Sequence, residues 1–157
     1  MISKKTKYAI KALLHLAKNY GEGPTLIGHL SETEKIPKKF LEAILLDLKK
    51  QGILGSKMGA GGGYYLIKKP NEVMMSQILR STDGPIALIP CVSLNFYERC
   101  DDCIDEASCG IRDVMIDVRK ATLKILSATT LEDILKREHR LSAASKSHKT
   151  KKKNKSN

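Results

Sequence analysis

Aromatic residues are scarce in this sequence, and long apolar runs are missing. Of its 157 residues none is tryptophan and only two are phenylalanine. This scarcity disfavours a large aromatic ligand pocket and a surface for stacking single-stranded bases, so a double-stranded nucleic acid is the better partner. Residues 1–18 carry lysines through their apolar pattern and lack the continuous apolar stretch that a signal peptide or a membrane span needs. We therefore expect a cytoplasmic protein that does not enter a membrane.

Acidic residues are few in the first half of the chain and at its end. Residues 1–80 contain 14 lysines and arginines against 6 acidic residues, and residues 136–157 contain 9 against 1. Residues 81–135 reverse this balance, with 5 against 10. A basic segment can lie against phosphate groups, which would repel an acidic one. The length suffices for one ordinary core, so we expect one compact domain with an appendage.

Three segments of the first half show helical spacing of apolar residues. The first covers residues 6–19, the second about two turns from residue 26, and the third residues 38–51 after Pro37. Two helices joined by a short turn, the second of them opening with lysines, make a helix-turn-helix candidate. The residues of the third segment that fall outside its apolar stripe would face a DNA groove: Lys38, Lys39, Glu42, Ala43 and Lys49.

A glycine-rich hairpin follows these helices. Residues 53–57 and 64–68 have the length and composition of short strands, and the sequence MGAGGG separates them. Such a hairpin would form a wing beside the third helix, where glycines let the backbone approach a sugar-phosphate chain closely. The residues expected to meet DNA here are Lys57, Gly61, Gly62 and Gly63.

All four cysteines lie in residues 85–109, a segment without periodicity. Thiols of a protein that is not exported normally stay reduced, so clustered cysteines indicate metal ligands or redox thiols. Their acidic surroundings are too polar for thiols that merely fill a core. An iron–sulfur cluster, a zinc ion and a redox disulfide all suit such a set. The candidate ligands are Cys91, Cys100, Cys103 and Cys109.

The rest of the chain predicts a long one-sided helix and a basic tail. Apolar residues form a seam along residues 111–126, which is typical of a dimerisation helix. Thr130 and Asp133 resemble a capping box that opens a short final helix. The expected organisation is a winged helix-turn-helix domain (1–84), a cysteine-containing cofactor loop (85–109), a dimerisation helix with the short helix (110–136) and a basic disordered tail (137–157).

A known family shares an ordered set of these features. They are Tyr8-Ala9, Ala12-Leu13-Leu14, Leu16-Ala17, Ile36-Pro37, Phe40-Leu41-Glu42, Leu48 to Leu54, Ser56, the Gly59-x-Gly61-Gly62-Gly63-Tyr64 wing, and a cysteine loop before a long helix. On these residues the chain resembles the Rrf2 family of winged helix-turn-helix transcription regulators over roughly residues 1–135. The resemblance implies that the third helix enters the major groove and that the wing touches the neighbouring minor groove.

The resemblance also implies roles for single residues. Glu42 matches a position that family members use to read a base edge, consistent with a carboxylate accepting from cytosine N4. Met58 departs from the pattern, because cluster-regulating members often place there an arginine that enters the minor groove. Lys57 remains able to contact phosphate.

Within the cysteine loop the match is good at the ends and poor in the middle. Cys91 and Cys109 stand at the positions of the family's outer cluster ligands. Cys100 and Cys103 stand where the regulator of cluster biogenesis has a single cysteine, and Arg112 stands where it has a ligating histidine. The simplest reading is that all four cysteines hold a two-iron or a four-iron cluster.

Together these observations predict a homodimeric, mainly α regulator with a small β-hairpin wing, which binds double-stranded DNA under control of an iron–sulfur cluster. A structural zinc ion or a thiol/disulfide switch at the same cysteines is the alternative. An enzyme is not expected, because Cys100-x2-Cys103 lies in an acidic loop where nothing evident lowers a thiol pKa. No small-molecule substrate is inferred.

Overall fold

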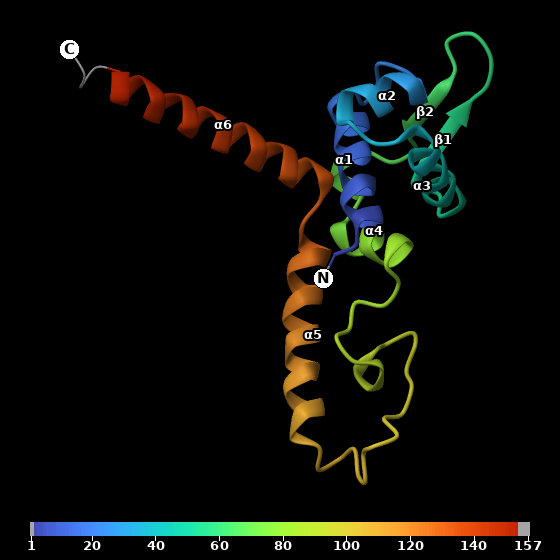
Figure 1. Cartoon of the computed structure of the whole chain (residues 1–157), viewed down its shortest axis with the longest axis vertical. Helices are drawn as coiled ribbons and strands as arrows, with labels where there is room; N and C mark the ends of the chain where they lie inside the picture. Colours follow the sequence, from blue (N-terminus) through green and yellow to red (C-terminus); the bar gives the residue numbers. More distant parts are fainter. Residues whose placement is uncertain (1, 154–157) are drawn as a thin grey trace.

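The computed structural model describes residues 2–153, with side chains through residue 145. Its helices and strands are α1 (Lys4–Lys18), α2 (Ile27–Glu34), α3 (Lys38–Lys50), β1 (Leu54–Lys57), β2 (Gly63–Leu66), α4 (Met75–Thr82), α5 (Gly110–Ala128) and α6 (Leu131–Lys153), with 3₁₀ turns η1 (Pro70–Glu72) and η2 (Pro90–Val92). We call residues 2–83 with residues 130–135 the head, and residues 84–129 the arm. Figure 1 shows the arm extending from the head, with α6 leaving in another direction.

The head is held together by the apolar stripes of its helices. On α3 four leucine and isoleucine side chains of the predicted stripe are fully buried, whereas Phe40 of the same stripe is 40% exposed. Phe40 instead packs edge-on against Tyr8 of α1, with ring centroids 5.7 Å apart. The core residues without exposed surface include Ala9, Ala12, Leu13, Leu30, Leu41, Ile44, Leu45, Leu48, Leu54, Val73, Ile78 and Leu131. The three predicted helices and the hairpin are confirmed, with ends shifted by a few residues.

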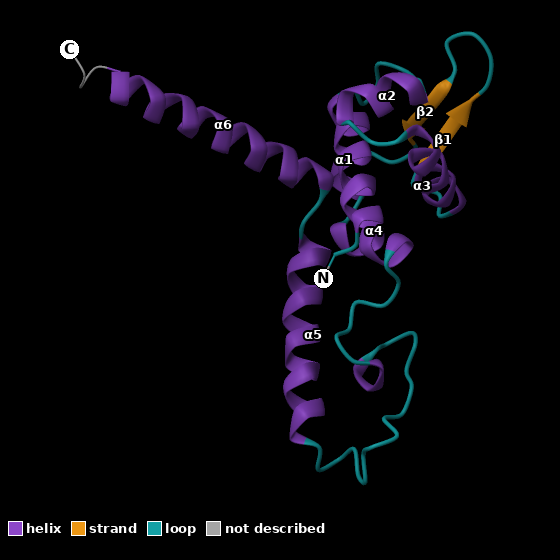
Figure 2. Ribbon diagram, in the orientation of Figure 1, coloured by secondary structure: helices purple, strands orange, loops and turns teal. Residues whose placement is uncertain are grey.

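The hairpin is attached to the segment before α2 by an isolated β-bridge. Strands β1 and β2 pair antiparallel, with Leu54 opposite Leu66 and Lys57 opposite Gly63 (Figure 2). Thr25, just before α2, exchanges two backbone hydrogen bonds with Tyr64, at 2.8 and 2.9 Å. This pairing fixes the wing relative to the helix-turn-helix, because Thr25 belongs to the chain segment that enters α2.

The arm is anchored to the head at both of its ends. It leaves after Asp83, the C-cap of α4, and returns through α5 to Thr130, which pairs with Met74 of the head. Leu131, directly after this bridge, is fully buried in the head. Residue 131 belongs to the expected short helix after the dimerisation helix, and the division into segments stays a prediction.

Helix α6 differs from the expected short helix and disordered tail. It runs from Leu131 to Lys153, through most of the segment 137–157, whereas residues 154–157 lie outside the described residues. The predicted capping box is confirmed, since Thr130 and Asp133 exchange hydrogen bonds of 2.9 and 3.1 Å. Because the tail lacks apolar residues, it cannot pack against the head through an apolar face, but its backbone can still form helical hydrogen bonds. Its lysines, arginines and alanines are good helix formers. Within residues 2–153 no helix has the length and apolar character needed to cross a membrane.

An ion pair between α1 and α3 gives a testable pH dependence. Lys5 donates a 2.7 Å hydrogen bond to Asp47, and this bond holds the pKa of Asp47 below its ordinary value of 3.8. A carboxyl whose folded pKa is depressed stabilises the fold above its unfolded pKa, and this contribution is lost as pH falls through the folded pKa. Because both side chains are about one third exposed, we expect less than about 1 kcal/mol from the pair.

We therefore expect Asp47→Asn to lower the free energy of unfolding near pH 6 and to match the wild type near pH 3. Chemical denaturation at several pH values measures this difference. Glu42→Gln, which removes an exposed carboxylate from the same helix, is the control and should change stability little at either pH. A wild-type advantage over Asp47→Asn that is unchanged from pH 6 to pH 3 would contradict the prediction.

Candidate DNA-binding surface and cysteine site

The exposed side of α3 presents the residues that the sequence predicted. Lys38, Lys39, Glu42, Ala43 and Lys49 are all exposed. The opposite side of the helix is buried in the head, so these residues form one outward surface. Their placement agrees with a helix that can enter a DNA groove, and it leaves the DNA contact itself a prediction.

Unlike Lys38 and Lys39 on the same exposed side of α3, Lys49 is hydrogen-bonded to another element of the chain. Its ammonium group donates a 2.7 Å hydrogen bond to the hydroxyl of Ser56 on β1. The bond joins the end of α3 to the first strand of the wing. Lys49 therefore helps to orient the wing relative to α3.

The glycines of the wing have different surroundings. Gly61 is exposed at a φ of +73°, and a Cβ there would meet nothing within 4 Å. Gly62 is buried, and a Cβ on it would overlap the carbonyl oxygen of Lys57. Gly63 has a φ of +140°, and its Cβ would overlap the carbonyl oxygen of Thr25. Gly62 and Gly63 are thus required by the fold of the wing itself, and Gly61 is the glycine that is open to a partner.

The tip of the wing carries one cation and one long apolar side chain. Lys57 is exposed at the end of β1, and Met58 next to it is 92% exposed. Lys57 is the residue predicted to contact DNA here, and its exposure leaves that contact possible, whereas Met58 stands where the resemblance places an arginine.

All four cysteines line one cavity of the arm. The cavity has a volume of about 460 Å³ and is also bordered by acidic residues and by Arg112. Cys91 is buried, Cys103 and Cys109 are partly exposed, and Cys100 is exposed. The structure thus brings together every predicted cysteine, although they are spread over 19 residues of the chain.

Two of these cysteines are held by regular structure. Cys91 lies in η2, and Arg119 of α5 donates a hydrogen bond to the carbonyl oxygen of the next residue, Val92. Cys109 is the N-cap of α5, and its carbonyl oxygen accepts from the amide of Asp113 at 3.1 Å. The outer cysteines are therefore both fixed to α5.

The acidic residues of the loop shape the turn before Cys109. Asp105 accepts hydrogen bonds from the amides of Ala107 and Ser108, at 3.1 and 3.2 Å, and from the Ser108 hydroxyl at 2.8 Å. The Ser108 hydroxyl bond is the main reason that the pKa of Asp105 lies below its ordinary value. The sequence analysis treated Asp105 as part of a polar environment and missed this role, although an Asx turn is a known use of aspartate.

A second acidic residue joins the two halves of the loop. Tyr97 donates a 2.5 Å hydrogen bond to Glu106, whose other oxygen lies 3.8 Å from Nε of Arg112. Arg112 therefore stands beside the cysteines as the cation that faces Glu106. Its position matches the resemblance, but a guanidinium cannot replace a ligating histidine.

The environment of Cys103 opposes formation of its thiolate. Partial burial and a hydrogen bond with Cys109 raise the pKa of the Cys103 thiol, and nearby Glu106 acts in the same direction. A bound metal would supply the positive charge that four thiolates need, and its binding would release protons.

Among the described side chains, those of residues 2–145, no three of histidine, cysteine or acidic type lie close enough to hold one metal ion together. The ligands of an iron–sulfur cluster bind different iron atoms, so they lie farther apart than four ligands around one zinc ion. The four cysteines share a cavity without being gathered at one point.

Comparison with known proteins identifies a family. The profile of the Rrf2 family, described as an iron-dependent transcriptional regulator, matches residues 2–137. An rrf2-like HTH-type transcriptional regulator of Rhodobacter capsulatus is 46% identical over 138 residues, which cover 86% of this chain and 92% of the relative.

Solved structures extend this likeness to the fold. CymR, described as the global cysteine regulator of B. subtilis, superposes with a TM-score of 0.70 at 32% identity, covering 85% of this chain and 95% of CymR. IscR of T. potens superposes with a TM-score of 0.67 at 27% identity, covering 88% of each chain. The expected helical fold with a two-stranded wing is confirmed.

Proposed function

Because this chain belongs to the Rrf2 family of transcription regulators, which are not enzymes, we propose that it binds double-stranded DNA with an affinity set by an iron–sulfur cluster. The proposed ligands are Cys91, Cys100, Cys103 and Cys109, and the proposed reading surface is the exposed side of α3 with the wing. The cluster would supply a redox-active centre that can be oxidised, reduced or lost.

The observation that carries this proposal is the single cavity that all four cysteines line. Four thiolates satisfy a two-iron or a four-iron cluster without any further ligand. The fit holds although Arg112 replaces the ligating histidine of the regulator of cluster biogenesis, because the additional cysteine supplies the missing donor. Arg112 then offsets part of the negative charge of the thiolates and of Glu106.

We propose that the protein acts as a homodimer through α5. None of the 19 residues of α5 is buried in this chain, and its apolar seam includes Ile111, Val114 and Ile125, each more than half exposed. A second copy would cover this seam and place two α3 helices in successive turns of the major groove. Rearrangement of the cysteine loop would move the start of α5, and with it the separation of the two reading surfaces.

Anaerobic isolation tests the cofactor. Iron and inorganic sulfide in comparable amounts, with a visible absorption spectrum, are expected, whereas stoichiometric zinc without sulfide contradicts the iron–sulfur proposal. DNA affinity is then compared in the loaded and metal-free forms, with a duplex selected from a random library by the wild-type protein. Equal affinity of the two forms would contradict the proposed control.

The lysines at the start of α3 give a prediction for the DNA contact. We expect Lys38→Ala and Lys39→Ala each to weaken binding at all sequences and to reduce the slope of log affinity against log salt by about 1. Glu42→Gln is expected instead to change the preferred base at one position. Fluorescence anisotropy titrations at several salt concentrations measure both effects.

Lys35→Ala is the matched control, since Lys35 is an exposed lysine at the opposite end of the turn between α2 and α3. It occupies the left-handed region at a φ of +54°, so its stability is checked separately. An unchanged salt slope in both Lys38→Ala and Lys39→Ala would show that α3 does not lie against phosphates.

A thiol–disulfide switch is the second candidate. Its supporting observation is that Cys103 and Cys109 line the same cavity and that Cys109 is among the groups that raise the pKa of the Cys103 thiol. This candidate predicts a metal-free protein whose DNA affinity changes on oxidation and returns with a thiol reductant.

A further inference from the structure

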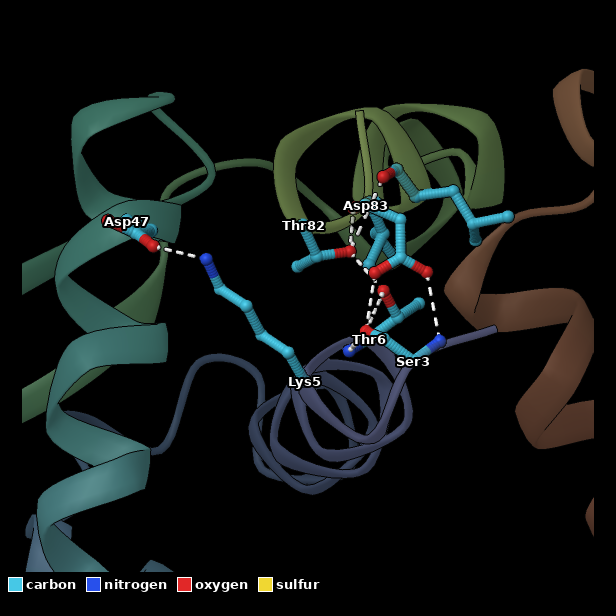
Figure 3. Close-up of polar contacts among 8 residues, drawn as sticks. Ser3, Lys5, Thr6, Asp47, Thr82 and Asp83 are labelled. Carbon is cyan, nitrogen blue, oxygen red and sulfur yellow. Dashed lines mark hydrogen bonds and ion pairs between the residues drawn. The ribbon is translucent and has the colours of Figure 1, made fainter. Parts of the chain in front are cut away.

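The first turn of α1 contacts both the helix that leads into the arm and the helix proposed to read DNA. Figure 3 shows Ser3 and Thr6 on one side of this turn and Lys5 on the other. Ser3 is also the N-cap of α1, accepting from the amide of Thr6 at 3.1 Å. One helical turn is thus hydrogen-bonded to two separate elements.

On the arm side, the contacts are made to the last two residues before the arm begins. The amide of Ser3 donates to Asp83 at 3.0 Å, and its hydroxyl donates to the other carboxylate oxygen. Thr6, which is fully buried, lies 2.5 Å from the Thr82 hydroxyl, and Thr82 in turn donates to the carbonyl of Ile78 at 2.9 Å. Either hydroxyl can donate in the bond between Thr6 and Thr82.

On the reading side, the contact is the Lys5–Asp47 ion pair. Asp47 lies on α3, one turn before the end of the helix, and Lys5 reaches it at 2.7 Å. The pair adds little stability, because both side chains are partly exposed. It does set a fixed relation between α1 and α3 that apolar packing alone would not set.

The arm side is continuous with the cysteines. Helix α5 begins at Cys109 and is bound to the turn containing Cys91 through Arg119. Near its end, Ser127 donates a 3.2 Å hydrogen bond to Ser76 of α4. Movement of the cysteine loop can therefore reach α4 through α5. Because Thr82 is the last residue of α4, such a movement would also reach the contact between Thr82 and Thr6.

We propose that the first turn of α1 is a connector that transmits the state of the cysteine site to α3, with Thr6 and Lys5 as its two contacts. This inference rests on the proposed function, in which that state alters DNA binding. The hydrophobic effect is non-directional, whereas hydrogen bonds add a directional constraint on rotation and register. The polar contacts at both sides of this turn therefore make α4, α1 and α3 move together.

Cutting either contact tests the connector in the full chain. Lys5→Met removes the α3 contact. Thr82→Val removes the contact with Thr6, and it is made together with Asp83→Ala, which removes the two hydrogen bonds from Ser3. Lys4→Met removes the same charge from an exposed neighbour, and Ser81→Ala removes a hydroxyl from the same turn of α4, so these are the matched controls. Should Lys5→Met fold poorly, Asp47→Asn removes the same contact from the other side.

The main measurement is hydrogen–deuterium exchange of the loaded and metal-free forms. In the wild type and both controls, loading should slow exchange in residues 84–109 and change it in α3 by at least about threefold. In Lys5→Met and in the double variant Thr82→Val with Asp83→Ala the change in 84–109 should remain, and that in α3 should fall below about 1.5-fold. The ratio of DNA affinities between the two forms should fall from about tenfold towards one in the same variants.

The two proposals fail in different ways. A wild type that takes up no iron and sulfide contradicts the cluster, and the same comparison is then made with the zinc-bound or oxidised form. The connector is overturned if the change in α3 persists in both Lys5→Met and the double variant Thr82→Val with Asp83→Ala, or if a wild-type change in residues 84–109 does not reach α3.

Discussion

Replacing Gly63 by alanine is expected to destabilise the chain by about 2–4 kcal/mol, which lowers the melting temperature by roughly 10 °C. Two causes add at this position. The backbone has a φ of +140°, which side chains of L-residues rarely adopt, and the new methyl group would overlap the carbonyl oxygen of Thr25. Because that carbonyl belongs to the pairing with Tyr64, relief of the overlap would detach the wing from the helix-turn-helix.

Gly61→Ala separates this structural requirement from DNA contact. Gly61 also has a positive φ, but a Cβ there meets nothing within 4 Å, so a loss of only about 1 kcal/mol is expected. If the wing approaches DNA at Gly61, its alanine variant loses affinity while remaining folded. Thermal unfolding by circular dichroism measures the first effect, and equal destabilisation by the two variants would contradict the assigned contact with Thr25.

Replacing Cys91 by serine is expected to abolish the proposed cofactor and its control of DNA binding. Cys91 is the most buried of the four cysteines and is held by Arg119 through the neighbouring carbonyl. Iron and sulfide after anaerobic isolation should fall to about a tenth of the wild-type content or less. The affinity ratio between the two forms should fall from at least about tenfold to about one.

The same measurement on Cys100→Ser and Cys103→Ser shows whether each of these two middle cysteines is a ligand. If all four thiolates ligate, both variants lose the cluster as Cys91→Ser does. Asp101→Asn, between them on the same exposed loop, is the control and should retain iron and sulfide. If Cys100→Ser keeps the wild-type content of iron and sulfide, the set of four cysteine ligands is contradicted. The fourth ligand would then be a group other than the Cys100 thiol.

The elements that could be predicted from the sequence are those with a strong local signal. The apolar stripe of α3 gave its length and its exposed residues, and Thr130 with Asp133 gave the start of α6. The cysteines could be grouped because they occur in one short segment. Each of these predictions uses only residues that are close in the sequence, so it did not require knowledge of which distant residues contact one another.

The features that could not be predicted depend on distant partners. Nothing near Gly63 in the sequence indicates that its hydrogen atoms face Thr25, 38 residues earlier. Lys5 and Asp47 are likewise ordinary charged residues of amphipathic helices until the packing of α1 on α3 brings them together. The length of α6 escaped prediction because a lack of apolar residues was taken as a lack of helix.

The burial of Leu131 has a consequence for the order of folding. Its side chain completes a core whose other members come from residues 9–79, so this contact closes only after the whole arm has been synthesised. Contacts of such large sequence separation form late and slowly. The DNA-binding part is therefore expected to reach its final packing only after residues 84–129 have been synthesised, although its own helices and wing precede them in the chain.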